Sequence, residues 1–228
     1  MKRFFAFLCG AFLSVALLAL MLSGALEAAG TNPEIMFSMM RRHAPPEKTG
    51  VDESEYPALS GMVAAYLSGG VDVFQYTDRD GHALFNEREQ THMRDVRGLF
   101  VLDRKVLMIS AVVTLLMVLL LAFLSRDAGR KGALWGVAVS GLGILGLTIA
   151  GALDFSRLFI AFHRLMFTND LWILNPETDC LIRLMPSSFF MEYALIIAGV
   201  VLILFGAWTV FLVIWDRRAG ERRKHGVS

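Results

Sequence analysis

The sequence has few cysteines and no marked excess of charge. Only Cys9 and Cys180 occur in its 228 residues. Cys9 lies within a hydrophobic run and Cys180 lies in a distant polar region, so we expect no disulfide between them. The formal net charge is +1, which is not the basic balance that nucleic-acid binding requires. We therefore expect no nucleic-acid partner.

Four long segments contain no Asp, Glu, Lys, Arg or His. They are Phe4–Leu26, Val106–Leu124, Gly132–Leu153 and Tyr193–Trp215. At about 1.5 Å per residue, each is long enough as a helix to cross a hydrocarbon core of roughly 30 Å. A backbone in lipid must satisfy its own hydrogen bonds, so we predict four membrane-spanning helices. The lack of charges within them disfavours ion-coupled transport, which needs ionisable groups at depth.

Basic residues flank the predicted spans on one side. They precede the first span, fill the turn between the second and third, and follow the fourth: Lys2, Arg3, Arg126, Arg130, Lys131, Arg217, Arg218, Arg222, Arg223 and Lys224. The positive-inside rule then predicts a multi-pass protein of the cell membrane with both termini in the cytoplasm. Residues 31–104 and 154–192 form the two outer loops.

The first hydrophobic segment has an alternative interpretation as a cleaved secretory signal peptide. Its apolar run is longer than the usual hydrophobic region of such a peptide, and Glu27 stands within the candidate cleavage site. Retention as a span is favoured for both reasons.

These features predict an all-α integral membrane protein with a single membrane domain, residues 1–228. Four transmembrane helices form a bundle, and the two outer loops form an extracytoplasmic cap. Small residues recur at helical spacing along the third span: Gly132, Gly136, Ser140, Gly143, Gly146 and Gly151. A face of this kind favours close helix packing, with a lipid or substrate groove as the alternative.

The first outer loop is predicted to contain several short elements. Prolines within Thr31–Tyr56 argue against one continuous helix there. The dipeptide Asp80–Gly81 predicts a short hairpin between residues 73–76 and 82–85. From Asn86 onward a helical pattern runs into the second span.

The second outer loop begins with an amphipathic pattern. Residues 155–166 carry apolar side chains at helical spacing, which suits a helix lying in the headgroup plane. His163 would then lie at the lipid surface. The aromatic residues Trp172, Phe189 and Phe190 are either interfacial anchors or the lining of an acyl-chain groove.

Two histidines are the strongest candidates for catalysis. His92 has Glu89 and Asp95 three residues away on either side, so a carboxylate can reach its imidazole on a helix. A carboxylate in that position raises the basicity of a histidine, as a general base near neutral pH requires. His163 is the second candidate and has Asp170 nearby. Ordinary ion pairs on a solvated helix face are the alternative for the group around His92.

Other catalytic signatures are missing from the sequence. There is no Gly-x-Ser-x-Gly elbow, and Ser187 and Ser188 have no neighbouring base. There is no His-Glu-x-x-His motif, and Cys180 is isolated. We therefore expect no serine nucleophile, no metal and no other cofactor.

The segments around the two histidines carry a family resemblance. One is residues 89–97, Glu-Gln-Thr-His-Met-Arg-Asp-Val-Arg; the other is residues 162–172, continued by Pro176, Asp179 and residues 186–190. Together they resemble the signature of an integral membrane family whose characterised member is the bacterial lipoprotein intramolecular transacylase. The family usually has a lysine where Arg97 stands, a change that keeps the charge but not the amine.

The resemblance implies an acyl transfer within one lipoprotein. The sn-2 acyl chain of the diacylglyceryl group on the N-terminal cysteine moves to the α-amino group of that cysteine, which leaves a lyso-form lipoprotein. The expected partners are the diacylated lipoprotein N-terminus and membrane lipids. An α-amino group with a pKa of about 8 is partly protonated at neutral pH, so the reaction needs a base.

The histidines suit this chemistry. His92 is the expected base, and His163 is the expected acid or oxyanion stabiliser. The residues expected to support them are Glu89 or Asp95 for His92 and Asn169 or Asp170 for His163, together with Arg97 and Trp172. Another lipid or lipoprotein hydrolase with the same histidines, or a non-catalytic envelope scaffold, is the alternative.

Overall fold

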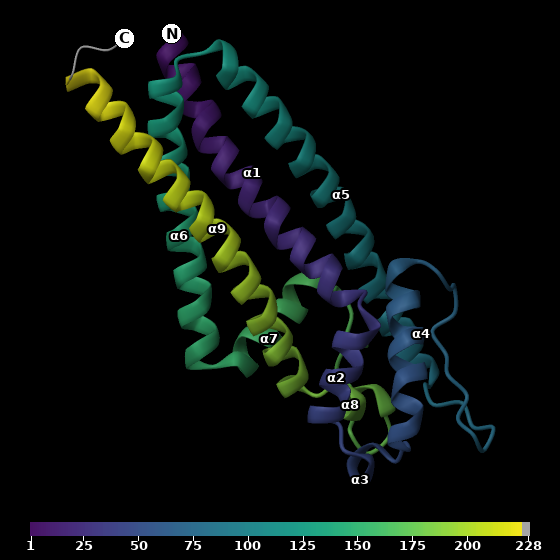
Figure 1. Cartoon of the computed structure of the whole chain (residues 1–228). Coiled ribbons are helices and arrows are strands. Elements are labelled where there is room, and N and C mark those ends of the chain that lie inside the picture. The colour runs from purple at the N-terminus through teal and green to yellow at the C-terminus, as the bar shows by residue number, and fades with distance from the viewer. Residues whose placement is uncertain (225–228) are drawn as a thin grey trace. The chain divides into compact units, whose positions relative to one another are not determined.

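The structure, a computed structural model, describes residues 1–224, with side chains described for residues 1–221. The side chains of Arg222, Arg223 and Lys224, part of the predicted basic cluster, lie outside this range. The described chain is helical and contains no strand longer than one isolated bridge. Its elements in order (Figure 1) are α1 (Lys2–Gly30), α2 (Pro33–His43), α3 (Pro46–Thr49), the 3₁₀ helix η1 (Glu53–Glu55), α4 (Tyr56–Ser68), α5 (Glu87–Phe123), α6 (Arg126–Leu153), α7 (Phe155–Met166), α8 (Cys180–Leu184) and α9 (Ser187–Lys224).

Four helices, α1, α5, α6 and α9, are long and apolar enough to cross a membrane. They contain the four predicted spans, so that prediction is confirmed by length and composition. Helices α5 and α9 have 37 and 38 residues, about 55 Å each, which exceeds the hydrocarbon thickness. In α5 the excess is the polar N-terminal part, residues 87–105, as the sequence predicted.

Contacts between residues divide the chain into two compact units. Unit 1 contains Met1–Ala25, Lys105–Ile149 and Ala198–Ser228. Unit 2 contains Leu26–Arg104 and Ala150–Ile197. Unit 2 thus includes both predicted outer loops and both candidate histidines.

Within unit 1, α1 and α6 approach each other at glycines. A Cβ atom added at Gly132 would lie 1.8 Å from the Phe7 carbonyl oxygen, and one at Gly136 would lie 2.5 Å from that of Ala11. No side chain fits at these separations, so the packing interpretation of the small-residue face is confirmed for both glycines. By contrast, Gly143 has open space around its Cα atom.

An ion-pair cluster joins three helices of unit 1. The Asp127 carboxylate lies within 4.0 Å of the cationic groups of Arg3, Arg130 and Lys131, and Arg130 also pairs with Asp216 at 2.8 Å. The cluster therefore brings the start of α1, the start of α6 and the last part of α9 together at one end of unit 1 (Figure 1).

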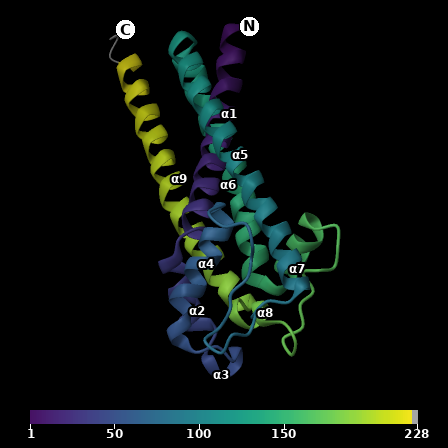
Figure 2. The same cartoon turned by 90° about the vertical axis from the view of Figure 1, so that its right-hand side faces the viewer.

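Unit 2 has a hydrophobic core of its own. Helix α2 packs along α4, as Figure 2 also shows. Core side chains with 5% exposure or less include Met36, Met39, Met40, Tyr56, Leu59, Val63, Phe85, Met93, Leu184 and Phe189. Phe189 is 2% exposed, which contradicts one of its two alternatives, that of an interfacial anchor.

The first outer loop forms several short helices, as its prolines predicted. Each of α2, α3 and α4 has a proline in its first turn, where a missing N–H costs nothing. The predicted hairpin around Asp80–Gly81 is reduced to a single bridge between Thr77 and Ala83. Gly81 adopts a φ of +86°, which a turn at this position requires and which glycine allows. The segments on either side of the turn do not pair further as strands.

The glycine contact in unit 1 predicts that Gly132→Val destabilises the protein. The added side chain would overlap the α1 backbone, so we expect the melting temperature in detergent to fall by roughly 5 °C or more. Gly143→Val, on the same helix but in open space, is the control for lost helix propensity. Equal melting temperatures for the two variants would contradict the α1–α6 contact.

Candidate active site

The polar start of α5 is fixed by a capping box. The Asn86 side-chain oxygen accepts the Glu89 backbone N–H at 3.1 Å, and Glu89 Oε2 accepts the Asn86 backbone N–H at 2.8 Å. This reciprocal pair satisfies two N–H groups that have no partner within the helix. It fixes the first turn of α5 directly before His92.

The second oxygen of Glu89 ties α5 to α8. Glu89 Oε1 accepts the Leu181 backbone N–H at 2.6 Å, and the Glu89 side chain is 1% exposed. Asp179, next to α8, accepts hydrogen bonds from the Asn86 amide at 2.8 Å and the Asn175 backbone at 2.7 Å. Burial acts to raise the pKa of the Asp179 carboxyl, but the hydrogen bonds outweigh it and hold the pKa below its usual value.

His92 lies on α5, one turn after Glu89, and is 7% exposed. The centroid of its ring lies 6.2 Å from that of His163 and 5.3 Å from that of Phe167. The Nδ1 atom of His92 is buried and has no hydrogen-bond partner among the described residues. A buried polar atom without a partner is costly, and a ligand oxygen or nitrogen would relieve that cost.

His163 lies on the amphipathic helix α7, which Asp154 caps by accepting the Arg157 backbone N–H at 3.0 Å. His163 Nδ1 lies 2.7 Å from the Phe159 carbonyl oxygen. A carbonyl only accepts hydrogen bonds, so Nδ1 carries the proton and Nε2 has the lone pair. Burial lowers the pKa of the His163 imidazole, and the bond to Phe159 offsets part of this effect.

Aromatic rings surround His163. The ring centroids of Phe159, Trp172, Phe162 and Phe167 lie 4.2, 5.0, 5.5 and 5.5 Å from that of the imidazole. His163 is 8% exposed, so its ring is enclosed by protein side chains, and its place at the lipid surface stays a prediction. The α7 side chains that are exposed instead include Ile160, Phe162 and Leu165.

The carboxylates expected to orient His92 have other partners. Both oxygens of Glu89 accept backbone N–H groups, as described above. Asp95 accepts the Asn169 side-chain amide at 2.9 Å, which joins α5 to the segment after α7. Glu89 and Asp95 therefore position backbone segments, and no hydrogen bond joins either to His92 in the described part of the chain.

The remaining expected site residues have varied surroundings. The Asp170 backbone carbonyl accepts a hydrogen bond from Arg88 at 2.6 Å, and Trp172 packs on His163. The Arg97 guanidinium lies over the Tyr66 ring at 4.9 Å and near Asp72 at 3.3 Å. Arg97 thus stabilises the end of α4.

Three structural features near the histidines were not identified from the sequence: the Asn86 cap, the Phe159 carbonyl that fixes the His163 tautomer, and the contact of Phe167 with both rings. The Asn-x-x-Glu spacing at residues 86–89 is a sequence signature of the cap. Phe159 stands four residues before His163, so on a helix its carbonyl group lies within reach of the His163 side chain. The contact of Phe167 with both imidazoles depends on tertiary packing, and no local pattern indicates it.

A comparison with protein families identifies the chain. The sequence profile of the family described as lipoprotein intramolecular transacylase Lit matches residues 11–190, most of the sequence. The chain belongs to this family. No curated protein matches the sequence.

Solved structures of this transacylase from Bacillus cereus have the same fold. One is 19% identical, with a TM-score of 0.74, and covers 94% of this chain and 98% of its own. A His→Ala variant of that protein is 21% identical, with a TM-score of 0.72 and coverage of 94% and 96%. A His→Arg variant is 20% identical, with a TM-score of 0.67 and coverage of 96% and 95%.

Membership of the transacylase family and the similarity to its solved structures confirm the resemblance and two further predictions. The chain is an all-α integral membrane protein with four candidate spans. It is also an acyltransferase of the lipoprotein intramolecular transacylase family.

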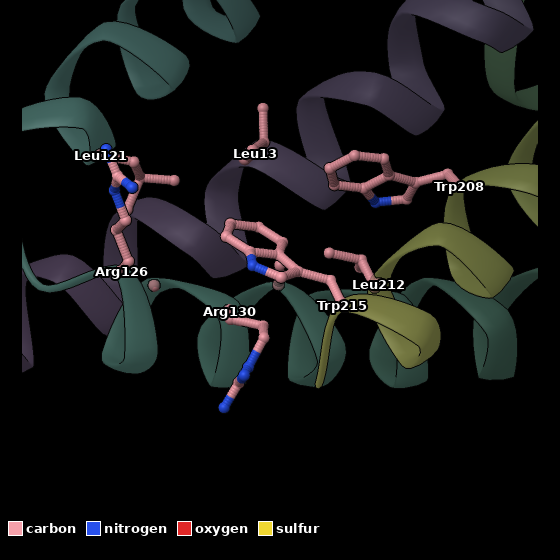
Figure 3. A pocket seen from close by; sticks show the side chains of 9 residues that line it. Leu13, Leu121, Arg126, Arg130, Trp208, Leu212 and Trp215 are labelled. Atoms are coloured by element: carbon pink, nitrogen blue, oxygen red, sulfur yellow. The ribbon is translucent and has the colours of Figure 1, made fainter. Parts of the chain in front are cut away.

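A cavity of about 30 Å³ in unit 1 is too small to be the substrate site. Figure 3 shows Trp208 and Trp215 of α9 facing Leu13 of α1 across it. A pocket for a small-molecule ligand has a volume of hundreds of cubic ångströms, and a diacylglyceryl group with its two acyl chains needs at least as much space. Neither histidine lines this cavity.

One group of side chains in unit 2 has metal-ligand spacing. Ligand atoms of Asp78, Asp80 and His82 lie within 4.8 Å of one another in the turn near the single bridge. The Asp78 carboxylate accepts the backbone N–H groups of Asp80 and His82 and lies 3.7 Å from the His82 imidazole, and Asp80 and His82 are exposed. Exposed acidic turns of this kind are common without an ion, so we assign no metal to it.

The double role of Glu89 predicts the effect of Glu89→Gln. A glutamine offers one oxygen and one NH₂ group, so one of the two backbone N–H groups loses its acceptor in a buried position. We expect the free energy of unfolding to fall by about 1–3 kcal/mol. Measurement of the melting temperature and of hydrogen exchange at the Leu181 amide will check this. Glu87→Gln, an exposed change in the same turn, is the control, and a fall of the same size there would refute the argument.

Proposed function

We propose that the chain transfers the sn-2 acyl chain of a diacylglyceryl lipoprotein to the α-amino group of its own N-terminal cysteine. The observation that carries this proposal is the pair of buried imidazoles of His92 and His163, 6.2 Å apart, in a chain of the transacylase family. Both rings can reach one reacting ester and amine through hydrogen bonds of about 3 Å. Donor and acceptor belong to one molecule, so positioning replaces a covalent acyl-enzyme.

The reaction needs a net movement of one proton. A bond forms between the amine nitrogen and the ester carbon, and the bond from that carbon to the glyceryl oxygen breaks. The proton that leaves the nitrogen reaches the glyceryl oxygen. A base must take the proton first, and a donor must stabilise the negative oxygen of the tetrahedral intermediate.

The hydrogen bond of the His163 ring and the partnerless Nδ1 of His92 support a division of roles that differs from the one favoured by the sequence. His163 has a fixed tautomer with the Nε2 lone pair free, which suits the base. As the nitrogen–carbon bond forms, the amine nitrogen becomes more acidic, so a base of lowered pKa suffices. His92 has a buried, partnerless Nδ1, which suits a donor to the oxyanion.

The membrane orientation belongs to the same proposal. The basic residues at one end of unit 1 support cytoplasmic termini. The loops that contain the histidines are then extracytoplasmic, on the side where lipoproteins carry their acylated cysteine. The exposed apolar side chains Ile160, Phe162 and Leu165 on α7 support entry of the ester from the lipid phase.

Mass spectrometry of a purified diacylated lipoprotein incubated with the protein in detergent tests the function. We expect the total mass to stay unchanged while one acyl group becomes amide-linked to the cysteine. Loss of one acyl chain would instead indicate a hydrolase. An unaltered lipoprotein would indicate a non-catalytic scaffold.

The same assay tests the two histidines. His92→Ala and His163→Ala are each expected to lower the rate by roughly 10²-fold or more, because each removes an acid–base or oxyanion interaction. His82→Ala, an exposed histidine in the same unit, is the control and should retain the rate. Near-normal turnover in either of the first two variants would remove that residue from the proposed site.

The lowered pKa of His163 predicts a two-step pH profile. The neutral amine of the substrate is lost below its pKa of about 8, so kcat/KM should fall about tenfold per pH unit. Because the His163 pKa lies below its ordinary value of 6.5, the base is lost only at lower pH. At that lower pH kcat/KM should fall about a hundredfold per pH unit, because protonation of the substrate amine and protonation of His163 each inhibit the reaction.

Rate measurements at decreasing pH, starting from about 9 and thus above the amine pKa of about 8, will locate the steeper limb. In His163→Ala the steeper limb should disappear while the first limb remains. A steeper limb that persists in this variant would exclude His163 as the base.

A further inference from the structure

A transacylase of this kind must prevent water from reacting with the ester. The same base and oxyanion donor that assist the amine also assist a water molecule. Attack by water would form a bond between its oxygen and the ester carbon and break the bond to the glyceryl oxygen. The products would be a free fatty acid and a lyso-form lipoprotein with an unmodified amine. Exclusion of water is an established means of suppressing such side reactions.

Phe167 occupies a distinctive position beside the two histidines. Its ring centroid lies 5.3 Å from that of His92 and 5.5 Å from that of His163. Among the described residues, it is the one phenylalanine whose ring contacts both imidazoles. Phe159, Phe162 and Trp172 contact His163.

The backbone holds Phe167 in this place. Phe167 is the C-cap of α7, and its N–H donates to the His163 carbonyl oxygen at 2.9 Å. The chain leaves the helix there in an extended conformation, with φ −118° and ψ 136°. The residue is 8% exposed, so its ring fills buried volume beside both imidazoles that water would otherwise reach.

We propose that Phe167 determines the choice of acyl acceptor by excluding water from the space between His92 and His163. This inference rests on the proposed transacylase function and adds a specificity-determining residue to it. With the ring in place, the tethered amine is the nucleophile that reaches the ester. Without the ring, the space vacated at both imidazoles admits water.

The test is the ratio of released fatty acid to amide-linked product in Phe167→Ala. We expect this ratio to rise by roughly tenfold or more over the wild-type ratio, because removal of an aromatic ring opens a buried volume. Mass spectrometry in H₂¹⁸O will identify fatty acid formed by hydrolysis through its heavy oxygen. The ratio comes from active molecules alone, so a merely lower amount of folded protein does not change it.

Two further variants distinguish the loss of side-chain volume at residue 167 from a general disruption of the fold. Phe167→Leu retains a large apolar side chain and should keep the ratio near that of the wild type. Phe155→Ala, on the same helix with a ring that contacts Phe159 rather than either histidine, should also keep it. An equal rise in Phe155→Ala and Phe167→Ala would overturn the inference.

The outcomes separate this inference from the proposed function. Amide-linked product from the wild type supports the function, and its absence contradicts the function itself. If the wild type transfers the acyl chain and Phe167→Ala does so without added fatty acid, only the inference on Phe167 fails. Should Phe167→Ala not accumulate in the membrane, Phe167→Val is expected to raise the same ratio, and an unchanged ratio there overturns the inference equally.

Discussion

The buried carboxylate of Glu89 is the contact on which the arrangement of the histidine pair depends. Its two oxygens accept N–H groups from the start of α5 and from α8. N–H groups at the start of a helix have no partner within that helix. The buried Glu89 carboxylate accepts one such group from each of the two helix starts. His92 follows one turn later on α5, so its position is set by a hydrogen-bonded helix start and not by a direct contact from a carboxylate.

The two imidazoles are chemically different although both are buried. His163 donates its Nδ1 proton to a backbone carbonyl, while His92 Nδ1 has no partner in the described part of the chain. One ring therefore has a defined tautomer, and the other retains a polar atom for a ligand. The surrounding aromatic rings lower the local polarity, which strengthens hydrogen bonds to a reacting ester and disfavours charged imidazolium. The Phe167 ring contributes to this apolar environment at both histidines, because it contacts both imidazoles.

Local patterns predicted the helices well and the partners of polar side chains poorly. The continuous helix from Asn86 into the second span and the amphipathic helix at residues 155–166 were both correct, since hydropathy and spacing report on nearby residues. Of the two carboxylates expected to orient His92, Glu89 instead accepts the backbone N–H of Leu181, which is 92 residues away along the chain. Burial of His163 depends on packing by rings from more than one segment.

The sequence by itself determined the four apolar spans, the helical class and the two candidate histidines. An uncharged run of this length satisfies its own backbone hydrogen bonds in lipid as a helix, and residue types suited to catalysis can be identified without a structure. Only the tertiary structure decided which side chains contact those histidines. It brings the ring centroids of the imidazoles within 6.2 Å, fixes one tautomer and places the Phe167 ring beside both. Contacts of this kind join residues that are distant in the chain, so no local periodicity can specify them.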